Sequence, residues 1–545
     1  MSLTSSNSKV EHVFVVMLEN RSFDNMLGRA GIPGLPSIES YSNSYGSKTY
    51  SVGKTKAPCT MTTDPGHEMI DVLQQLTNAP SNGKPSSKLP VYYPTLDPKN
   101  FPNGTGFVTN YVNNYDEDNP NPPAEGNRGD IMKCFSAEQA PVLSELAKQY
   151  AVCTNWFSSL PGPTWPNRLF VHFGSSLGLD VSPTKSQIAD WYSLGINTPS
   201  INPSIFDKLG SDNYKLYSDF DPRRTLNHWP YINPYYLYSQ FSDNPSNGGT
   251  TGATPQVNSI NGIAFTDVSS LKTNFEDDLE ATNYPAYTFI EPHYGDIYDG
   301  TYAGGSSQHP MDDIAGGEAL IKFVYETLVA SSIWEKSLLI ITYDEHGGFY
   351  DSVKPQKAVI PTSAAKANPY KYNELGFKFE HYGVRVPAVI VSPYIKKGTV
   401  DDTLYDHTSV LSTLKKLFNS VTGLPLTERD RWANHLLQLL TLNVPRKGAV
   451  TFNPAVACPD SVKPALTDEE RAQVYQKPLP ESGNLIGTMG ILLKTHHEFS
   501  WGNFISRAII NWQFKRIKTR GDLKVYADKV MKKAHRRREE HQKKQ

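Results

Sequence analysis

One short segment, residues 337–351 (SLLIITYDEHGGFYD), constrains the fold of this chain more than any other. Its first part, 337–343, is mostly apolar and β-branched, which is the pattern of a strand buried on both faces. Asp344, Glu345 and His346 follow without a spacer, and two glycines then allow a sharp turn. Adjacent carboxylates at the end of a buried strand are costly to desolvate unless a positive charge lies between them. The segment favours a divalent metal site, with a solvated strand-to-loop turn as the alternative.

Three further apolar runs, at 10–18, 287–290 and 386–391, also end in polar residues and predict strands. Helical patterns alternate with them. One runs over 136–152, with Ser136 and Gln139 placed as a capping box, and another runs to about residue 329 after a cap at Asp312 or Asp313. Such alternation predicts an α/β fold with a mostly parallel central sheet flanked by helices, and ligands bind beyond the carboxyl ends of such strands. The side chains expected to converge there are those of Glu19, Asn20, His293, Asp344 and Glu345.

A second candidate for chemistry is Thr164, which lies between a Pro/Gly-rich turn and a helical pattern that Asn167 begins. A hydroxyl at the start of a helix faces the backbone N–H groups that favour a phosphate. The alternative is that Thr164 is the N-cap of this helix, which on position alone is the commoner role of a threonine there.

The length of 545 residues predicts one large domain with additions. We expect a catalytic domain over 8–450, in which the poorly periodic residues 180–280 form an insertion over the active-site face. Residues 451–545 would be a C-terminal extension with a basic helical tail, since 13 Lys/Arg stand against 4 Asp/Glu from Lys515 onward. We expect a solvated charged end, with peripheral contact to a membrane or another anionic partner as the alternative. The acidic remainder of the chain argues against nucleic-acid binding.

The four cysteines lack the C-x-x-C spacing of zinc ribbons or thioredoxin-like sites. The first residues carry no basic region and no apolar run of signal-peptide length, and no window resembles a transmembrane helix. We therefore expect a soluble protein, cytoplasmic by default, with export that needs no such signal as an open alternative.

Seven short motifs together resemble one known family. They are ENRSFD (19–24), DPGH (64–67), GPTWPNR (162–168), QHP (308–310), YDEHGGFYD (343–351), GVRVPA (383–388) and DHTSVL (406–411). In this order they are similar to the phosphoesterase family of bacteria, fungi and plants. That family includes non-haemolytic, phosphatidylcholine-type phospholipases C and acid phosphatases of the AcpA type. The resemblance covers roughly residues 10 to 425 and implies an alkaline-phosphatase-like fold.

The resemblance also implies roles for single residues. Glu19, Asn20, Asp344 and Glu345 would bind one or more divalent metal ions. Oxygen ligands suit Mg²⁺, Mn²⁺ or Ca²⁺, and Zn²⁺ is also compatible. Thr164 would be the nucleophile. The residues expected around the phosphate are His293 and His309 as catalytic groups, with His67, Asn167, Arg168 and His407 in substrate binding. For Arg168, a salt bridge that fixes the helix is an equally good interpretation.

The predicted function is that of a metal-dependent phosphoester hydrolase. The first hypothesis is a phospholipase C that cleaves glycerophospholipids to diacylglycerol and a phosphorylated head group through a phospho-threonine intermediate. The second is an acid phosphatase of broad specificity. The third is a binding or scaffold protein that has lost turnover, against which the presence of all matched site residues argues. The pattern Thr164-x-Pro-x-Arg168 also resembles the Cys-x-Pro-x-Arg motif of sulfatases, but no cysteine here stands in such a motif.

Overall fold

The structure is a computed structural model of the 545-residue chain. It describes residues 3, 5–7, 9–78, 104–114, 122–188, 204–219, 275–276, 278–280, 283–361, 372–421, 423–454, 466–498 and 504–542. The expected insertion at 180–280, including its tyrosine cluster at 235–238, lies largely outside these residues.

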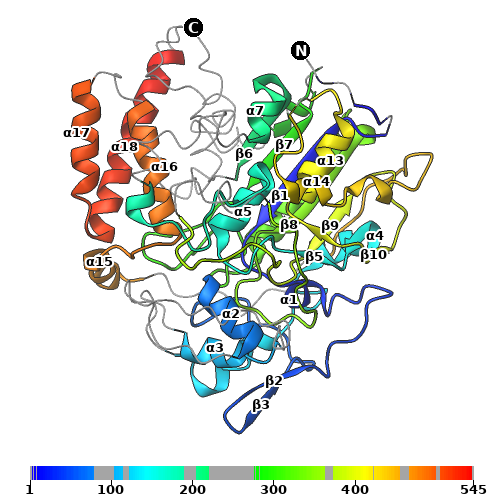
Figure 1. The fold of residues 1–545 in the computed structure, drawn as a ribbon, viewed down its shortest axis with the longest axis horizontal. Coiled ribbons are helices and arrows are strands. Elements are labelled where there is room, and N and C mark those ends of the chain that lie inside the picture. Colours follow the sequence, from blue (N-terminus) through cyan, green and yellow to red (C-terminus); the bar gives the residue numbers. More distant parts are fainter. Residues whose placement is uncertain are drawn as a thin grey trace.

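A seven-stranded sheet forms the centre of the described structure (Figure 1). Its strand order is β10-β4-β9-β8-β1-β7-β6. The strands are β1 (His12–Leu18), β4 (Ala151–Cys153), β6 (Tyr214–Ser218), β7 (Tyr287–Glu291), β8 (Ser337–Tyr343), β9 (Ala388–Val391) and β10 (Thr399–Asp401). Two small sheets pair β2 (Ser42–Tyr45) with β3 (Lys48–Ser51) and β5 (Trp156–Phe157) with β11 (Tyr405–Asp406).

The three central strands β8, β1 and β7 run parallel and in register. Val15 of β1 lies beside Ile340 of β8 on one side and beside Phe289 of β7 on the other. All three strands are fully buried after their first residues, as continuous apolar runs in parallel sheets are. Their carboxyl ends therefore meet at one edge of the sheet, and the predicted mostly parallel α/β architecture is confirmed.

One expected strand end is not at this edge. β9 pairs antiparallel with both β8 and β4, so the polar residues after Val391 leave the sheet on the opposite side. An apolar run indicates a buried strand but carries no information about its direction, so the sequence could not say which edge of the sheet this strand end would reach.

Part of the expected insertion belongs to the central sheet. β6 pairs in parallel with β7 over five residue pairs, from Tyr214 beside Tyr287 to Ser218 beside Glu291. The short helix α7 (Ile205–Leu209) precedes it with a complete capping box at Ser204 and Asp207. The outer strand of the sheet therefore lies in a segment whose sequence shows no clear period.

The helices pack around the sheet in two groups. α5 (Thr164–Phe173) contacts α13 (Ser409–Leu417), which contacts α14 (Glu428–Trp432), and α4 (Pro141–Gln149) contacts α11 (Ala315–Ala330) and β9. The helix expected over 136–152 is shorter than predicted. Only half of its capping box forms, as the Ser136 N–H donates to Gln139, and the helix begins at Pro141 because proline suits a first helical position. Residues 151–153 are strand β4.

The remaining helices belong to two peripheral regions (Figure 1). α1 (Phe23–Leu27), α2 (Met69–Thr77) and α3 (Phe107–Asn113) lie near the β2–β3 hairpin. α15 (Asp468–Gln476), α16 (Asn484–Glu498), α17 (Phe504–Lys515) and α18 (Arg520–Gln542) form the C-terminal extension, which stands beside the sheet on one flank. Short 3₁₀ turns occupy Glu125–Asn127, Asp130–Met132, Ser211–Asn213, Trp334–Lys336 and Leu436–Leu439.

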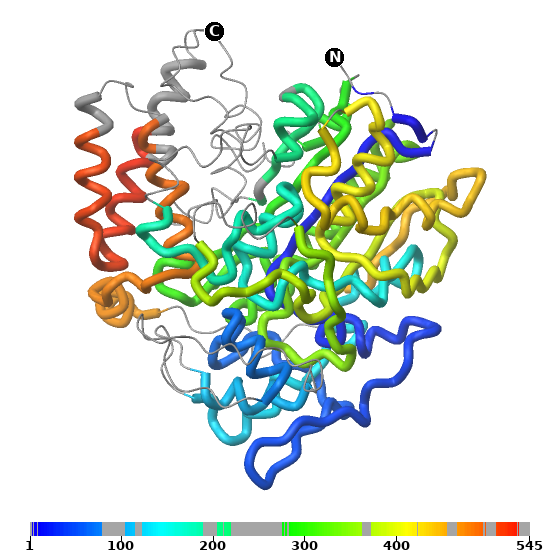
Figure 2. Tube along the Cα trace, viewed as in Figure 1, coloured from blue at the N-terminus to red at the C-terminus, as the bar shows by residue number. Residues whose placement is uncertain are grey.

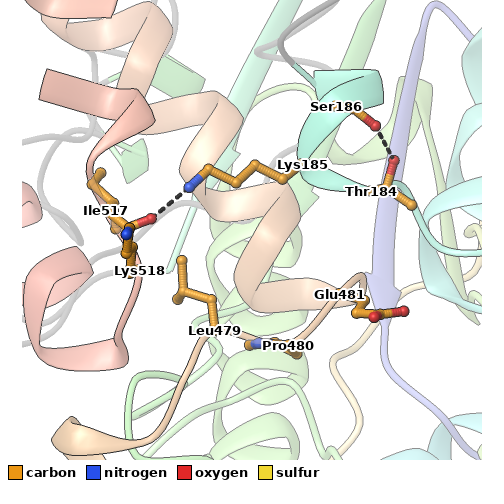
Figure 3. Close-up of a pocket in the computed structure, with 8 residues that line it drawn as sticks. All are labelled: Thr184, Lys185, Ser186, Leu479, Pro480, Glu481, Ile517 and Lys518. Atoms are coloured by element: carbon orange, nitrogen blue, oxygen red, sulfur yellow. Dashed lines mark hydrogen bonds between the residues drawn. The ribbon is translucent and has the colours of Figure 1, made fainter. Parts of the chain in front are cut away.

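The C-terminal helices are docked on the catalytic part of the chain (Figure 2). Arg520, buried at the start of α18, donates to the carbonyl of Tyr298 over 2.9 Å. The Lys185 ammonium reaches the carbonyl of Ile517, and a groove of about 460 Å³ lies at this seam between the two parts (Figure 3). Of the helices that the structure describes, none is long and apolar enough to cross a bilayer. Cys59 is disulfide-bonded, whereas Cys134 and Cys153 are free, buried thiols.

Candidate active site

The carboxyl ends of β1 and β8 meet through a close backbone approach. Asn20, two residues past β1, has a φ of 59°, a left-handed conformation that asparagine tolerates better than most residues. Gly347 faces it, and a Cβ there would lie 2.1 Å from the Asn20 carbonyl oxygen. Only glycine fits at residue 347, and the turn brings Asp344 against the Asn20 N–H, which it accepts over 3.1 Å.

Thr164 is the first residue of α5, and its hydroxyl is turned into this site. The N-cap is Pro163 and makes no side-chain cap, so the N-cap interpretation of Thr164 is wrong. Thr164 Oγ1 lies 3.3 Å from Glu19 Oε1 and 3.3 Å from Asn20 Oδ1, and all three side chains are buried. The helix start and the end of β1 thus bring three oxygen-bearing side chains to one point.

Asn484, the first residue of α16, completes this cluster from the C-terminal extension. Its amide nitrogen donates to Glu19 Oε1 over 3.0 Å, and its oxygen accepts from Trp165 Nε1 over 3.1 Å. One turn later, a Cβ at Gly487 would lie 1.8 Å from the Trp165 ring, so α16 packs directly on α5. Asn484 was not among the predicted site residues. Gly487, one of two glycines among the apolar residues of 485–493, is a local signal of close helix packing there.

Arg168 forms the ion pairs that the alternative interpretation predicts. Its Nε donates to Asp344 over 2.8 Å and its Nη1 to Glu291 over 2.6 Å, while Nη2 bonds the carbonyls at the end of β1. All three side chains are buried. The guanidinium therefore joins the ends of β7, β1 and β8, and this geometry favours a structural role over a phosphate contact. Glu291, which was not among the predicted site residues, belongs to this network.

The carboxylates of the site are crowded and short of positive charge. Burial raises the pKa of Glu19 well above its usual value, and the nearby Asp344 carboxylate adds to this. Burial also raises the pKa of Glu345 to about 8, although His67 opposes the shift. Glu345 accepts the N–H of Gly347 over 2.7 Å. Two carboxyl groups whose charged forms are disfavoured at neutral pH indicate a place for a cation.

Two of the predicted histidines lie together beside these acids. The rings of His67 and His309 are perpendicular at 6.2 Å, and His309 stacks on Tyr302 at 3.6 Å. His67 Nδ1 lies 2.9 Å from the Pro65 carbonyl, so Nδ1 carries a hydrogen. Burial lowers the pKa of His67, but Glu345 and Asp64 outweigh it and raise the pKa to about 10.

The contacts of His309, His293 and His407 show which ring nitrogen of each carries the hydrogen. His309 Nδ1 accepts the N–H of Met311 over 3.3 Å, and His293 Nδ1 accepts the N–H of Gly295 over 3.2 Å, so both neutral rings carry hydrogen on Nε2. His407 accepts from Trp156 at Nδ1 and donates from Nε2 to the Asp344 carbonyl over 2.6 Å. The contacts of His407 fix the backbone under the site.

Asn167 also serves the scaffold. It accepts the N–H of Leu160 and donates to the carbonyls of Gly162 and Pro163, which shapes the loop before Thr164. Farther out, Arg385 bonds both Asp24 and Asp351 and ties three motifs together. These polar side chains therefore hold motif segments in place rather than contact a substrate.

The residues fit a metal ion with oxygen ligands. Glu19 Oε2 is buried and has no hydrogen-bond partner among the described residues. Glu19, Asn20 and Thr164 direct oxygens to one place, and Asn and Thr complement carboxylates in sites for hard cations. By side-chain type alone, no group of three or more His, Cys, Asp or Glu within the described ranges is arranged to hold a metal. Asp344 is held by Arg168, so Glu19 and Asn20 are the better supported ligands.

Comparison with known proteins decides the family. A model of the phosphoesterase family matches residues 10–421. The chain belongs to the phosphoesterase family. This phosphoesterase is a hydrolase of phosphoric ester bonds, and it is 33% identical over 486 residues to non-specific phospholipase C6 of Arabidopsis thaliana, covering 86% of this chain and 80% of that one. It is 24% identical to phospholipase C A of Mycobacterium tuberculosis, covering 84% and 80%.

Solved structures are less similar. A phosphonate monoester hydrolase of Agrobacterium radiobacter matches with a TM-score of 0.29 at 12% identity, over 56% of this chain and 73% of that one. A protein of the alkaline phosphatase superfamily from Vibrio parahaemolyticus matches with a TM-score of 0.28 at 12% identity, over 52% and 60%. TM-scores of this size support no argument about this protein.

Proposed function

We propose that this phosphoesterase is a phospholipase C that hydrolyses glycerophospholipids to diacylglycerol and a phosphorylated head group. The names of its relatives support the substrate class, since non-specific phospholipases C of a plant and phospholipases C of a bacterium align over most of the chain. The structural observation that carries the proposal is the buried Thr164 hydroxyl, 3.3 Å from both Glu19 and Asn20 at the start of α5.

Thr164 is the proposed nucleophile. Its hydroxyl loses its proton as the oxygen attacks phosphorus and forms an O–P bond, while the bond from phosphorus to the glycerol oxygen breaks and diacylglycerol leaves with a proton. Water then attacks the phosphorus of the phospho-threonine, the O–P bond to Thr164 breaks, Thr164 regains a proton and the phosphorylated head group is released. A threonine hydroxyl is a weak nucleophile at its free pKa and needs activation. A divalent cation held by Glu19 and Asn20, with Asp344 and Glu345 nearby, would supply that activation and neutralise a phosphoryl oxygen.

The departing glycerol oxygen needs a proton. His293 and His309 are the residues expected for this role, but each accepts a backbone N–H at Nδ1, which disfavours the doubly protonated ring. His67 instead donates from Nδ1 to a carbonyl, so a second proton on Nε2 is compatible with its contacts. Hydrogen bonding thus favours His67 as the proton donor, with the Nε2–H groups of His293 and His309 as donors to phosphate oxygens.

The substrate assignment is tested by comparing hydrolysis of phosphatidylcholine with hydrolysis of p-nitrophenyl phosphate. We expect a higher kcat/KM for the phospholipid. Acid quenching during turnover, followed by mass spectrometry of the Thr164 peptide, should reveal the bound phosphorylated head group. A preference for the monoester would identify an acid phosphatase, and phosphate on any other residue would refute Thr164 as the nucleophile.

The role of His67 is tested with two leaving groups. His67→Gln should lower kcat/KM for dihexanoyl phosphatidylcholine by about 10²–10⁴-fold, the usual contribution of general acid catalysis. With p-nitrophenyl phosphorylcholine, whose leaving group needs no proton, the loss should be less than about tenfold. His435→Gln, at a partly buried histidine of another region, is the control. Equal losses on both substrates would exclude His67 as the proton donor.

A further inference from the structure

The outer faces of α17 and α18 expose apolar side chains among basic ones. In α17, Ile510 and Phe514 are buried against the rest of the extension, and the opposite side carries Ile509 and Trp512, which are 50% and 57% exposed. Large exposed apolar side chains that cluster at helical spacing mark interaction sites. α17 lies at the outer edge of the molecule, away from the central sheet (Figure 1).

α18 continues this face. Val525 is 69% exposed, and Lys529 and Lys532 follow it at positions i+4 and i+7, so the three lie on one side of the helix. The Lys529 ammonium donates to Gln513 of α17 over 3.0 Å, which joins the two helices at the surface. We call the side chains of Ile509, Trp512, Arg516, Val525, Lys529 and Lys532 the α17–α18 surface.

The charges of this surface select its partner. The guanidinium of Arg516 lies 4.3 Å over the Trp512 ring, and Lys529 and Lys532 are exposed beside it. Of the acids next to them, Asp522 caps the start of α18 by accepting the N–H groups of Lys518 and Thr519, and Asp528 pairs with Lys524 over 2.7 Å. Cations around an exposed tryptophan are the pattern of helices that lie in a bilayer interface, where the indole sits among head groups and the cations meet anionic lipid.

We propose that the α17–α18 surface docks this enzyme on a bilayer that contains anionic phospholipid. The proposal rests on the proposed phospholipase C function, because a diacyl substrate resides in a lipid surface. The net charge of the C-terminal segment favours an anionic bilayer over a second copy of this chain that docks through the same surface. The chain carries about +9 from Lys515 onward, so two such surfaces repel each other. α16 of the same extension contacts Glu19 through Asn484. The extension and the site are therefore one body, and docking of the extension brings the site to the bilayer as well.

The test measures sedimentation of the full chain with vesicles, in the Thr164→Ala background so that the lipid stays intact. Vesicles are made of phosphatidylcholine alone or with about one-third phosphatidylglycerol, an anionic fraction that attracts basic segments. We expect stronger binding to the anionic vesicles, weakened by salt, and about a tenfold loss for the double variant Ile509→Ser/Trp512→Ser. Lys529→Glu/Lys532→Glu should remove the preference for anionic lipid. Trp432→Ser, at a 69% exposed tryptophan of α14, is the matched control and should change binding less than twofold.

Three outcomes would overturn the proposal: equal binding to both vesicles, unchanged binding of the double variant, or a dimer that this variant dissociates. Without the Thr164 change, the double variant should hydrolyse dihexanoyl phosphatidylcholine below its micellar concentration within twofold of wild type. A chain that binds anionic vesicles but hydrolyses no phospholipid would refute the proposed function alone. One that hydrolyses the monomeric lipid but ignores vesicles would refute the docking surface alone.

Discussion

The Asn484 amide donates to Glu19 Oε1 over 3.0 Å, a hydrogen bond between residues 465 positions apart. Glu19 follows the central strand β1, whereas Asn484 opens a helix beyond the matched family segment 10–421. The same Asn484 side chain accepts from Trp165, which is next to Thr164. Asn484 is therefore placed to hold both the proposed ligand and the start of the helix that carries the proposed nucleophile.

Asn484→Ala should lower kcat by about 10–100-fold, the usual effect of removing a partner of a metal ligand. The variant should also lose about 1–3 kcal/mol of stability because the buried Trp165 Nε1 loses its acceptor. Turnover at saturating lipid and thermal melts measure the two effects. Asn434→Ala, at an exposed asparagine, is the control. Wild-type turnover by Asn484→Ala would show that the bond to Glu19 has no part in the reaction.

Thr164→Ala should reduce turnover by at least about 10³-fold, since no other hydroxyl takes over a displaced nucleophile. The melting temperature should shift by less than about 3 °C, because only weak 3.3 Å contacts are lost. Thr164→Ser keeps the hydroxyl and should retain measurable activity. Thr184→Ala, at the seam groove, serves as the matched control. Residual activity of Thr164→Ala above a tenth of wild type would contradict the assignment.

Arg168→Ala should destabilise the fold by about 3–5 kcal/mol, because it leaves the buried carboxylates of Asp344 and Glu291 uncompensated. Denaturant unfolding followed by fluorescence measures the loss. Arg431→Ala breaks a pair with Glu428 in which both side chains are about half exposed, and it should cost less than about 1 kcal/mol. If the two variants unfold at similar denaturant concentrations, the ion pairs of Arg168 with Asp344 and Glu291 are not the main link between the strand ends.

Removal of divalent metal should abolish turnover and lower the melting temperature, because repulsion among the buried carboxylates is then uncompensated. Elemental analysis before and after chelation establishes the metal content. Adding back Mg²⁺, Mn²⁺, Ca²⁺ or Zn²⁺ singly should restore both properties with one ion better than the rest. Full turnover by a sample shown to be metal-free would rule out the metal requirement.

Glu318 offers a pH test away from the site. It accepts the N–H groups of Val142 and Leu143 at the start of α4, and burial raises its pKa to about 7. The folded state then binds the proton more tightly than the unfolded state, so this group lowers stability as the pH rises from about 4.5 to 7. The loss in wild type relative to Glu318→Gln should be no more than about 3 kcal/mol over this range. If the free energies of unfolding of wild type and Glu318→Gln change in parallel between pH 4 and 8, the pKa of Glu318 is not raised.

The sequence predicted those parts of the fold whose signals are local. β8 spans the predicted residues 337–343, because its apolar run and the glycines after it mark both ends of the segment. Strand direction is not local, so the antiparallel course of β9 could not be predicted. The start of α4 was wrong because Pro141 outweighed the capping pair at Ser136 and Gln139.

For the site, the sequence predicted which polar residues end the central strands but not how they pair. Glu19, Asn20 and Thr164 meet, as the family resemblance implies, while Arg168 is paired with Asp344 and Glu291. Asn484 could not be found, since a single asparagine before a weakly periodic segment has no motif. Its contact depends on the packing of Gly487 against Trp165, which is visible only in three dimensions.

The contact between Gly487 and Trp165 ties the C-terminal extension to the helix that carries Thr164. A chain cut near residue 450 would keep every family motif, yet it would uncover a buried indole and leave Glu19 without its amide partner. We therefore expect the functional boundary of this enzyme to extend beyond its motif boundary, so that a graft of the motif region onto another tail should lose much of the activity unless that tail also brings a glycine and an amide to the same two places.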